Sequence, residues 1–115
     1  MPSPEIFCEE TGNPALPKIV FLHGLLGSSR NWRSVCKSLS EERHTFALDL
    51  RNHGKSFHSE DMSIRDMAND LLRWLDEMSL QSVVLCGHSL GGKVAMRFAS
   101  DHPERMDKLV VVDIA

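Results

Sequence analysis

The stretch SVVLCGHSLGGKVAMRF, residues 82–98, joins a strand-like segment to a helix-like segment through a serine that lies between glycines. Its first part, Ser82 to Cys86, is apolar and rich in β-branched residues, as expected of a buried strand. Its second part repeats apolar residues at helical spacing, namely Leu90, Val94, Ala95, Phe98 and Ala99. Residues 87–91, GHSLG, fit the G-x-S-x-G pattern of a nucleophile elbow, a strained turn that exposes its serine. The stretch therefore predicts Ser89 as a nucleophile.

The residues beside Ser89 suit the same chemistry. Gly87 and Gly91 leave room where side chains would crowd the sharp turn, with His88 between the first glycine and the serine. A helix that starts at Ser89 directs its unpaired N–H groups and its positive dipole end toward the reacting carbonyl. This arrangement predicts that backbone amides stabilise the oxyanion that develops during acyl transfer.

Two other interpretations of these residues remain open. In the first, the serine merely caps the helix that follows it. In the second, residues 87–93 match G-x-x-x-x-G-K of a phosphate loop, and KLVVVD, residues 108–113, resembles the strand whose aspartate holds Mg²⁺. Val94 argues against this nucleotide-binding alternative, because the residue after the lysine must offer a hydroxyl group to the metal.

Composition restricts the class of protein. The 115 residues are 42% hydrophobic and 25% charged, which indicates one soluble domain over residues 1–115. The net charge of −3 and the lack of a basic run predict no nucleic-acid partner and no attraction to a membrane surface. With neither a signal-peptide pattern nor an apolar run of about 20 residues, we expect a cytoplasmic protein.

Cysteines and histidines show no metal-binding pattern. The three cysteines are widely spaced and never form C-x-x-C, so neither a disulfide framework nor a zinc site is expected. The six histidines lack the spacing of a metal motif, and we expect most of them at the surface and in loops. The sequence therefore predicts no metal and no cofactor.

Strand and helix patterns alternate along the chain. Strands are expected at residues 4–10, 18–22, 44–50, 82–86 and 108–114, the first as an edge strand. Helices are expected over about three turns around Trp32 to Leu39, from a cap at Ser63 to Met78, and from Ser89 to Asp101. This alternation predicts an α/β fold with a mostly parallel sheet flanked by helices, and with functional groups at the carboxyl ends of the strands.

Four segments in order resemble the α/β-hydrolase fold superfamily, and within it the small bacterial esterases and thioesterases and their mitochondrial relatives. They are LHGLLGSSRNW (22–32), LDLRNHGKS (48–56), GHSLGGKVAM (87–96) and KLVVVDIA (108–115). The matches correspond to the first half of a family domain. The resemblance implies the amino-terminal, nucleophile-bearing portion of that fold.

The resemblance also implies roles for individual residues. Ser89 is similar to the family nucleophile, and the backbone N–H groups of Leu25 and Leu90 are similar to its oxyanion donors. Asp113 matches a position that some relatives use near the site, although most place the triad acid one strand later. His23 and His88 occupy structural positions of the motifs.

This sequence departs from the family pattern because it has no histidine at the position of the triad histidine. After Ser89 the only histidine is His102, which a helix of about 18 Å would separate from the serine. The resemblance implies a serine esterase or thioesterase that acts on short acyl esters. Without a triad histidine, we expect the 115-residue chain to be nearly inactive alone. The alternatives are a non-catalytic shortened form or fragment and, more weakly, the nucleotide binder.

An apolar edge at Leu109 to Val112 predicts self-association.

Overall fold

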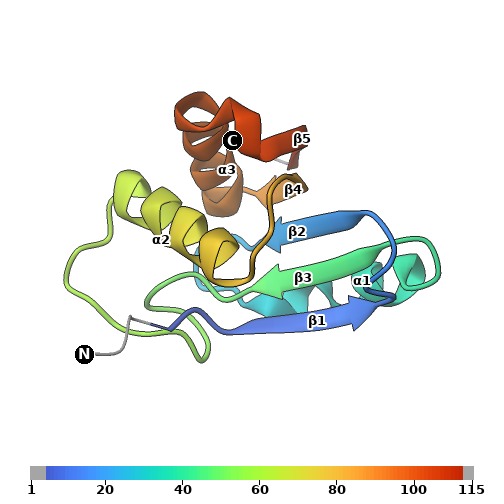
Figure 1. Cartoon of the computed structure of the whole chain (residues 1–115). Coiled ribbons are helices and arrows are strands. Elements are labelled where there is room, and N and C mark those ends of the chain that lie inside the picture. The colour runs from blue at the N-terminus through green and yellow to red at the C-terminus, as the bar shows by residue number, and fades with distance from the viewer. Residues whose placement is uncertain (1–4, 113–115) are drawn as a thin grey trace.

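The computed structural model of the chain describes residues 5–112. Strands and helices alternate over this range, as Figure 1 shows. The strands are β1 (Cys8–Gly12), β2 (Lys18–Leu22), β3 (His44–Leu48), β4 (Val83–His88) and β5 (Met106–Val112). The helices are α1 (Arg33–Leu39), α2 (Ile64–Glu77) and α3 (Leu90–Asp101), with short 3-10 turns η1 (Ser29–Trp32) and η2 (Pro103–Arg105).

The strands form one sheet in the order β1-β3-β2-β4-β5. β2 pairs in parallel with both β3 and β4, and β4 pairs in parallel with β5, whereas β1 runs antiparallel to β3. The predicted mostly parallel α/β sheet is confirmed. Because β2, β3 and β4 all end on the same side, the loops after Leu22, Leu48 and His88 meet at one edge.

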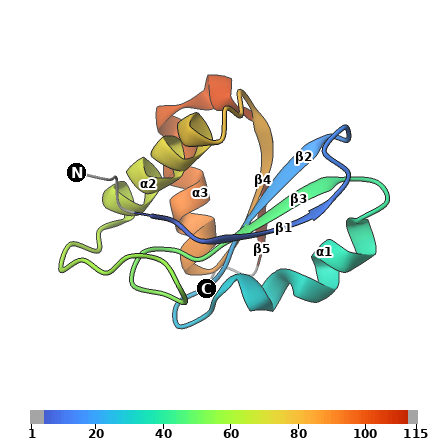
Figure 2. The same ribbon diagram turned by 60° about the horizontal axis from the view of Figure 1, so that its bottom comes forward.

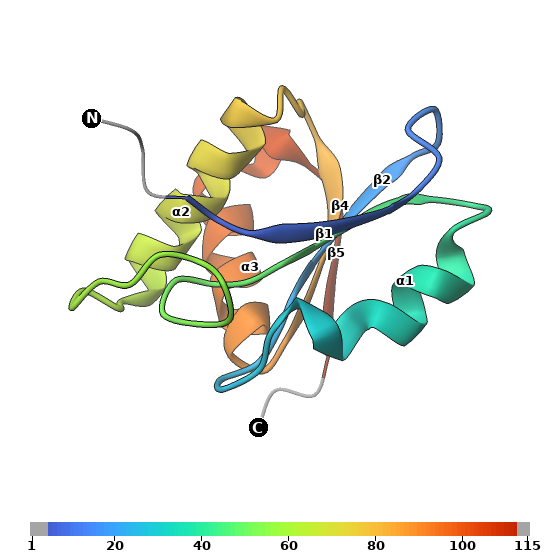
Figure 3. The same ribbon diagram turned by 90° about the horizontal axis from the view of Figure 1, so that it is seen from below.

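Helices cover both faces of the sheet, with α2 and α3 on one side and α1 on the other (Figures 2 and 3). The larger hydrophobic core lies under α2 and α3, and the smaller one lies under α1 around Phe21, Cys36, Ala47 and Cys86. Alternate residues of β2, β3 and β4 supply the two cores, which is why these strands are apolar almost throughout. No helix described over residues 5–112 is long and apolar enough to cross a membrane.

The helix predicted around Trp32 to Leu39 is shorter than expected. Ser28 and Asn31 form a capping box at the start of η1, and only seven residues of α-helix follow. Val35 is 40% exposed, although Trp32, Val35, Cys36 and Leu39 recur at the spacing of one apolar helix face, which predicts that Val35 is buried. The reason is that α1 packs on the sheet mainly through Cys36 and Leu39. In contrast, the cap predicted at Ser63 is present, since its Oγ accepts the N–H of Asp66 at 3.0 Å.

β5 is an edge strand of the described sheet, as expected, but it begins at Met106, two residues before the predicted start. Leu109, Val110, Val111 and Val112 are each 38–43% exposed, so apolar side chains are accessible on both faces of the strand. Asp113 lies outside the described residues.

Candidate functional site

Ser89 lies in a sharp turn between β4 and α3, with φ 53° and ψ −114°. A non-glycine residue reaches such backbone angles only where its surroundings impose them. Its N–H donates to the carbonyl of Val112 at 3.2 Å, and its carbonyl accepts the N–H of Lys93 at 3.1 Å. The Oγ makes no capping hydrogen bond to α3, so the interpretation of Ser89 as a mere helix cap is wrong.

Close backbone contacts explain the glycines on either side of Ser89. A Cβ added to Gly87 would lie 2.3 Å from the carbonyl oxygen of Gly91, and one added to Gly91 would lie 2.4 Å from that of Leu22. Both obstacles are backbone atoms, which a side-chain rotation cannot remove. The start of α3 therefore packs directly on the ends of β4 and β2, and this packing fixes the position of Ser89.

The loop after β2 lies against Ser89. It turns at residues 24–27, where the N–H of Gly27 donates to the carbonyl of Gly24 at 3.0 Å and Leu26 has φ 65°. A Cβ on Gly24 would lie 3.0 Å from Nδ1 of His88 and 3.4 Å from Cβ of Ser89. The absence of a side chain at Gly24 thus lets this turn approach the serine.

Two backbone amides near Ser89 have no acceptor among the described residues. Within residues 5–112, neither Leu25 nor Leu90 donates its N–H to another described group, whereas Leu26 donates to Nε2 of His53 at 3.1 Å. A pocket of about 480 Å³ opens beside Leu25. It is lined by His23, Gly24, Leu25, Leu26, Gly27, Asn31, Trp32 and His88.

His23 is buried, and both of its ring nitrogens are engaged. Nδ1 donates to the carbonyl of Gly24 at 2.7 Å, and Nε2 accepts the N–H of Leu50 at 3.0 Å. Burial lowers the pKa of His23 below its ordinary value, which keeps the ring neutral and able to accept. His23 therefore has no lone pair available for a serine proton. The expectation of surface histidines is wrong for His23, His44 and His53, which are all buried. Both ring nitrogens of His23 and of His53 make hydrogen bonds, whereas Nδ1 of His44 has no partner among the described residues.

The loop after β3 is organised by the buried carboxylate of Asp49, to which the sequence assigned no role. Oδ1 accepts the N–H of Ser29 at 2.6 Å, and Oδ2 accepts that of Lys55 at 2.9 Å. Gly54 has φ 50°, and a Cβ there would lie 2.1 Å from Oδ2. Asp49 therefore joins this loop to the start of η1.

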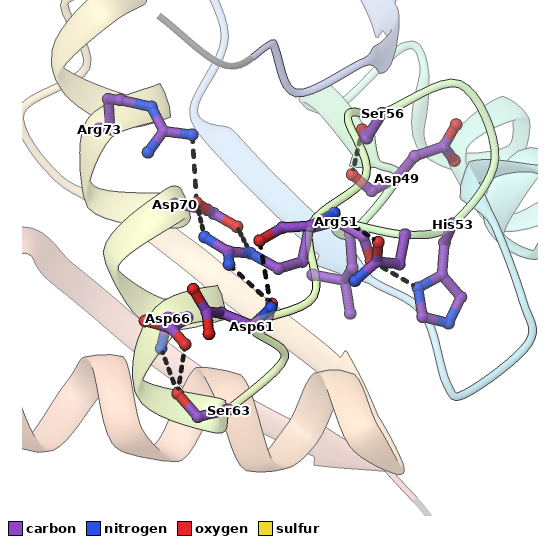
Figure 4. A network of polar contacts seen from close by, with 12 residues as sticks. Asp49, Arg51, His53, Ser56, Asp61, Ser63, Asp66, Asp70 and Arg73 are labelled. Atoms are coloured by element: carbon purple, nitrogen blue, oxygen red, sulfur yellow. Dashed lines mark hydrogen bonds and ion pairs between the residues drawn. The ribbon is translucent and has the colours of Figure 1, made fainter.

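Arg51 ties the same loop to α2 through a buried ion pair (Figure 4). Its guanidinium donates twice to Asp70, at 2.7 and 2.8 Å, and once to the carbonyl of Asp61 at 2.9 Å. The hydrogen bonds to Asp70 raise the pKa of Arg51 above its ordinary value. In the sequence, the only indication of this ion pair is that Asp70 lies among the apolar residues of α2.

The remaining predicted residues do not join the site in the described range. Asp113 lies outside that range, and His102 caps the carboxyl end of α3, at the end of the helix opposite Ser89. Oγ of Ser89 makes no hydrogen bond to any residue from 5 to 112. The described part of the chain thus brings together a serine and two amide donors, and leaves the serine without a base.

Comparisons with known proteins identify the family of the chain. A family model described as alpha/beta hydrolase fold matches residues 17–114. The sn-1-specific diacylglycerol lipase ABHD11 of Mus musculus is 46% identical over 106 residues, covering 90% of this chain and 34% of that protein. Ethanol acetyltransferase 1 of Kluyveromyces marxianus is 43% identical over 97 residues, covering 83% of this chain and 27% of that protein.

A solved structure shows the same similarity in three dimensions. A marine microorganism esterase has a TM-score of 0.94 and 42% sequence identity to this chain, over 98% of this chain and 43% of the esterase. The chain spans about a third of the length of the curated relatives it matches, at 34% and 27% of the two proteins.

Proposed function

Because this chain belongs to the α/β-hydrolase family, we propose that it carries the nucleophile and the oxyanion donors of a serine hydrolase that cleaves acyl esters. One observation carries the proposal. Ser89 lies in a strained turn between β4 and α3, and its Oγ has no hydrogen-bond partner among the described residues. Within the same range, the N–H of Leu25 in the loop after β2 and the N–H of Leu90 at the start of α3 have no acceptor. Strained backbone held by tight packing is characteristic of catalytic turns.

The proposed chemistry is acyl transfer. Oγ of Ser89 attacks the carbonyl carbon of the ester as its proton passes to a base, and the carbonyl oxygen becomes an oxyanion. The N–H groups of Leu25 and Leu90 donate to that oxyanion, and the dipole of α3 adds positive potential. Collapse of the intermediate expels the alcohol or thiol, and water then releases the acid and regenerates the serine.

The substrate class is proposed from the pocket and the relatives together. Leu25 is 63% exposed and Leu26 is 89% exposed, and both line the pocket beside Trp32. Such an apolar border favours an acyl chain over a charged group. The names of the relatives refer to a diacylglycerol lipase, an acetyltransferase and an esterase. We infer a small-molecule acyl ester or thioester as the substrate.

Binding of benzeneboronic acid tests the proposal on the 115-residue chain. Boron forms a bond to Oγ of Ser89, the serine proton goes to the buffer, and the anionic boronate mimics the tetrahedral intermediate. At saturating probe, the amide protons of Leu25 and Leu90 should move downfield in ¹⁵N-resolved NMR spectra. Ser89→Ala should remove both shifts and Ser100→Ala, at an exposed site on the same helix, should keep them. Shifts that persist in Ser89→Ala would contradict the proposal.

A non-catalytic role is the second candidate. It is favoured by the lack of a base near Ser89 in the part of the chain that the structure describes. In that case the chain keeps the pocket and binds the boronate weakly or not at all, and supplying the missing part of the domain confers no turnover. The family model and the relatives described above are hydrolases and an acyltransferase, which favours ester chemistry over the phosphate-loop alternative.

We also propose that two copies of the 115-residue chain pair through β5. Its apolar residues are exposed on both faces, and the described sheet offers no neighbour beyond it. Light scattering should show a mass above that of the monomer at high concentration. Val110→Lys should shift the distribution to monomers, while Val35→Lys, at a valine of similar exposure on α1, should not. A monomeric wild-type chain would refute this pairing.

A further inference from the structure

Two buried histidines join the loops after β2 and β3 in a reciprocal way. His23, at the end of β2, accepts at Nε2 the N–H of Leu50 from the other loop, at 3.0 Å. His53, in that other loop, accepts at Nε2 the N–H of Leu26, at 3.1 Å. The two ring centroids are 4.8 Å apart. We call His23 and His53, with these hydrogen bonds, the histidine latch.

Each ring of the histidine latch is fixed by a second hydrogen bond within its own loop. Nδ1 of His23 donates to the carbonyl of Gly24 at 2.7 Å, and Nδ1 of His53 donates to the carbonyl of Arg51 at 2.9 Å. Carbonyl oxygens only accept, so Nδ1 carries the proton in both rings and Nε2 is left as an acceptor. Both imidazoles must therefore be neutral for the latch to hold.

The ring of His53 is held in place by a buried ion pair. Arg51, whose carbonyl holds the ring, is itself held by the paired hydrogen bonds to Asp70 on α2 (Figure 4). His53 and Arg51 are 6% and 9% exposed, and Asp70 is 3% exposed. The imidazole of His53 is therefore held in a fixed orientation, because neither this ring nor Arg51 can move into solvent.

The turn that the latch holds has little else to fix it. Leu26 has φ 65°, a conformation that leucine rarely adopts, and its side chain is 89% exposed and makes no core contact. The turn is closed by the bond from Gly27 to Gly24 and by the bond from Leu26 to His53. Leu25 directly precedes Leu26 in the chain. The hydrogen bond from Leu26 to His53 therefore constrains where the N–H of Leu25 points.

We propose that His53 is a positioning residue that directs the N–H of Leu25 toward the oxyanion formed at Ser89. The inference rests on the function proposed above. His53 is not itself among the residues that line the pocket, and it makes no hydrogen bond to Ser89 within the described range. It acts through the amide of Leu26. Of the two rings, His53 is the one whose acceptor nitrogen binds the turn itself.

The experiment uses the ¹⁵N-labelled 115-residue chain, amide hydrogen exchange and titration with benzeneboronic acid. In His53→Ala, the amide of Leu26 should exchange about tenfold faster or more, while amides of β4 keep their protection. Boronate should still move the Leu90 amide but no longer the Leu25 amide, and its affinity should fall about tenfold or more. His53→Gln, whose side-chain oxygen can accept from Leu26, should restore much of both readouts, and His58→Ala, at an exposed site, should match the wild type.

The outcomes separate this inference from the proposed function. If the Leu25 amide responds to boronate in His53→Ala as it does in the wild type, the positioning role is refuted. Unchanged exchange of Leu26 in that variant would refute it equally. If boronate moves neither amide in the wild type, the serine chemistry itself fails, and the positioning role fails with it. If the amides of β4 lose their protection from exchange in His53→Ala, the test rests on His53→Gln. In that variant, the boronate-induced shift of the Leu25 amide must return together with the exchange protection of the Leu26 amide, and a failure to do so refutes the positioning role.

Discussion

A fluorophosphonate probe should label the 115-residue chain very slowly, on the order of 10⁶ times more slowly than a serine hydrolase with its complete triad. Ser89, the proposed nucleophile, lies in the sharp turn between β4 and α3, but its Oγ has no hydrogen-bonded base among residues 5–112. A serine hydroxyl without an aligned imidazole stays un-ionised at neutral pH and is a weak nucleophile. The oxyanion donors alone retain only about 10³ to 10⁴ over the reaction in water.

Intact-mass spectrometry over hours measures this rate. A serine on the same helix, Ser100, serves as the matched control, because Ser100→Ala removes an exposed hydroxyl and leaves the elbow unchanged. Rapid labelling that disappears in Ser89→Ala would contradict the expectation, since it would require a base within the chain. His23 is a poor candidate for that base, because both of its ring nitrogens already make hydrogen bonds.

Asp70→Asn should destabilise the chain by about 3–5 kcal/mol. The side chains of Asp70 and Arg51 are 4% and 10% exposed, and the substitution leaves the Arg51 guanidinium buried without its counter-charge. The same change loosens the support of His53, because Arg51 carries the carbonyl that holds the ring. Urea unfolding followed by circular dichroism gives the free energy of unfolding directly.

Asp76→Asn provides the control on the same helix. Asp76 also pairs with an arginine, Arg105, but its side chain is 61% exposed, so its loss should cost less than about 1 kcal/mol. Equal losses for the two variants would show that burial of the Arg51–Asp70 pair does not determine its contribution. A decrease of less than about 1 kcal/mol in the free energy of unfolding for Asp70→Asn would also show that burial does not determine the contribution of this pair.

Most of the elements could be predicted from local patterns. The apolar run KIVFL predicts β2 at the bounds that the structure shows, because a strand covered on both faces must be apolar throughout. The turn after β4 was predictable for a similar reason, since G-x-S-x-G describes a backbone that only small flanking residues permit. Local chemistry also predicted the cap at Ser63.

The arrangement around the site could not be predicted in the same way. The latch bonds at Leu26 and Leu50 each join residues 27 positions apart, and no periodicity in the sequence marks such a pair. The pattern placed Asp49 in the strand expected at residues 44–50 and Arg51 in the polar stretch after it, and neither position predicted burial. The fold buries both, Asp49 against backbone amides and Arg51 against Asp70. The exposure of Val35 depends on how α1 meets the sheet, which helical spacing does not determine.

The role of Ser89 is the central claim, and the site of covalent labelling tests it most directly. Residues 17–112 can replace the matching part of the marine microorganism esterase, whose remaining length supplies the rest of the domain. After a fluorophosphonate pulse, peptide mapping of this chimaera should place the adduct on Ser89, formed within minutes, and Ser89→Ala should abolish it while Ser100→Ala leaves it unchanged. An adduct on any other residue of the folded chimaera, or equal labelling of Ser89→Ala, would contradict the account.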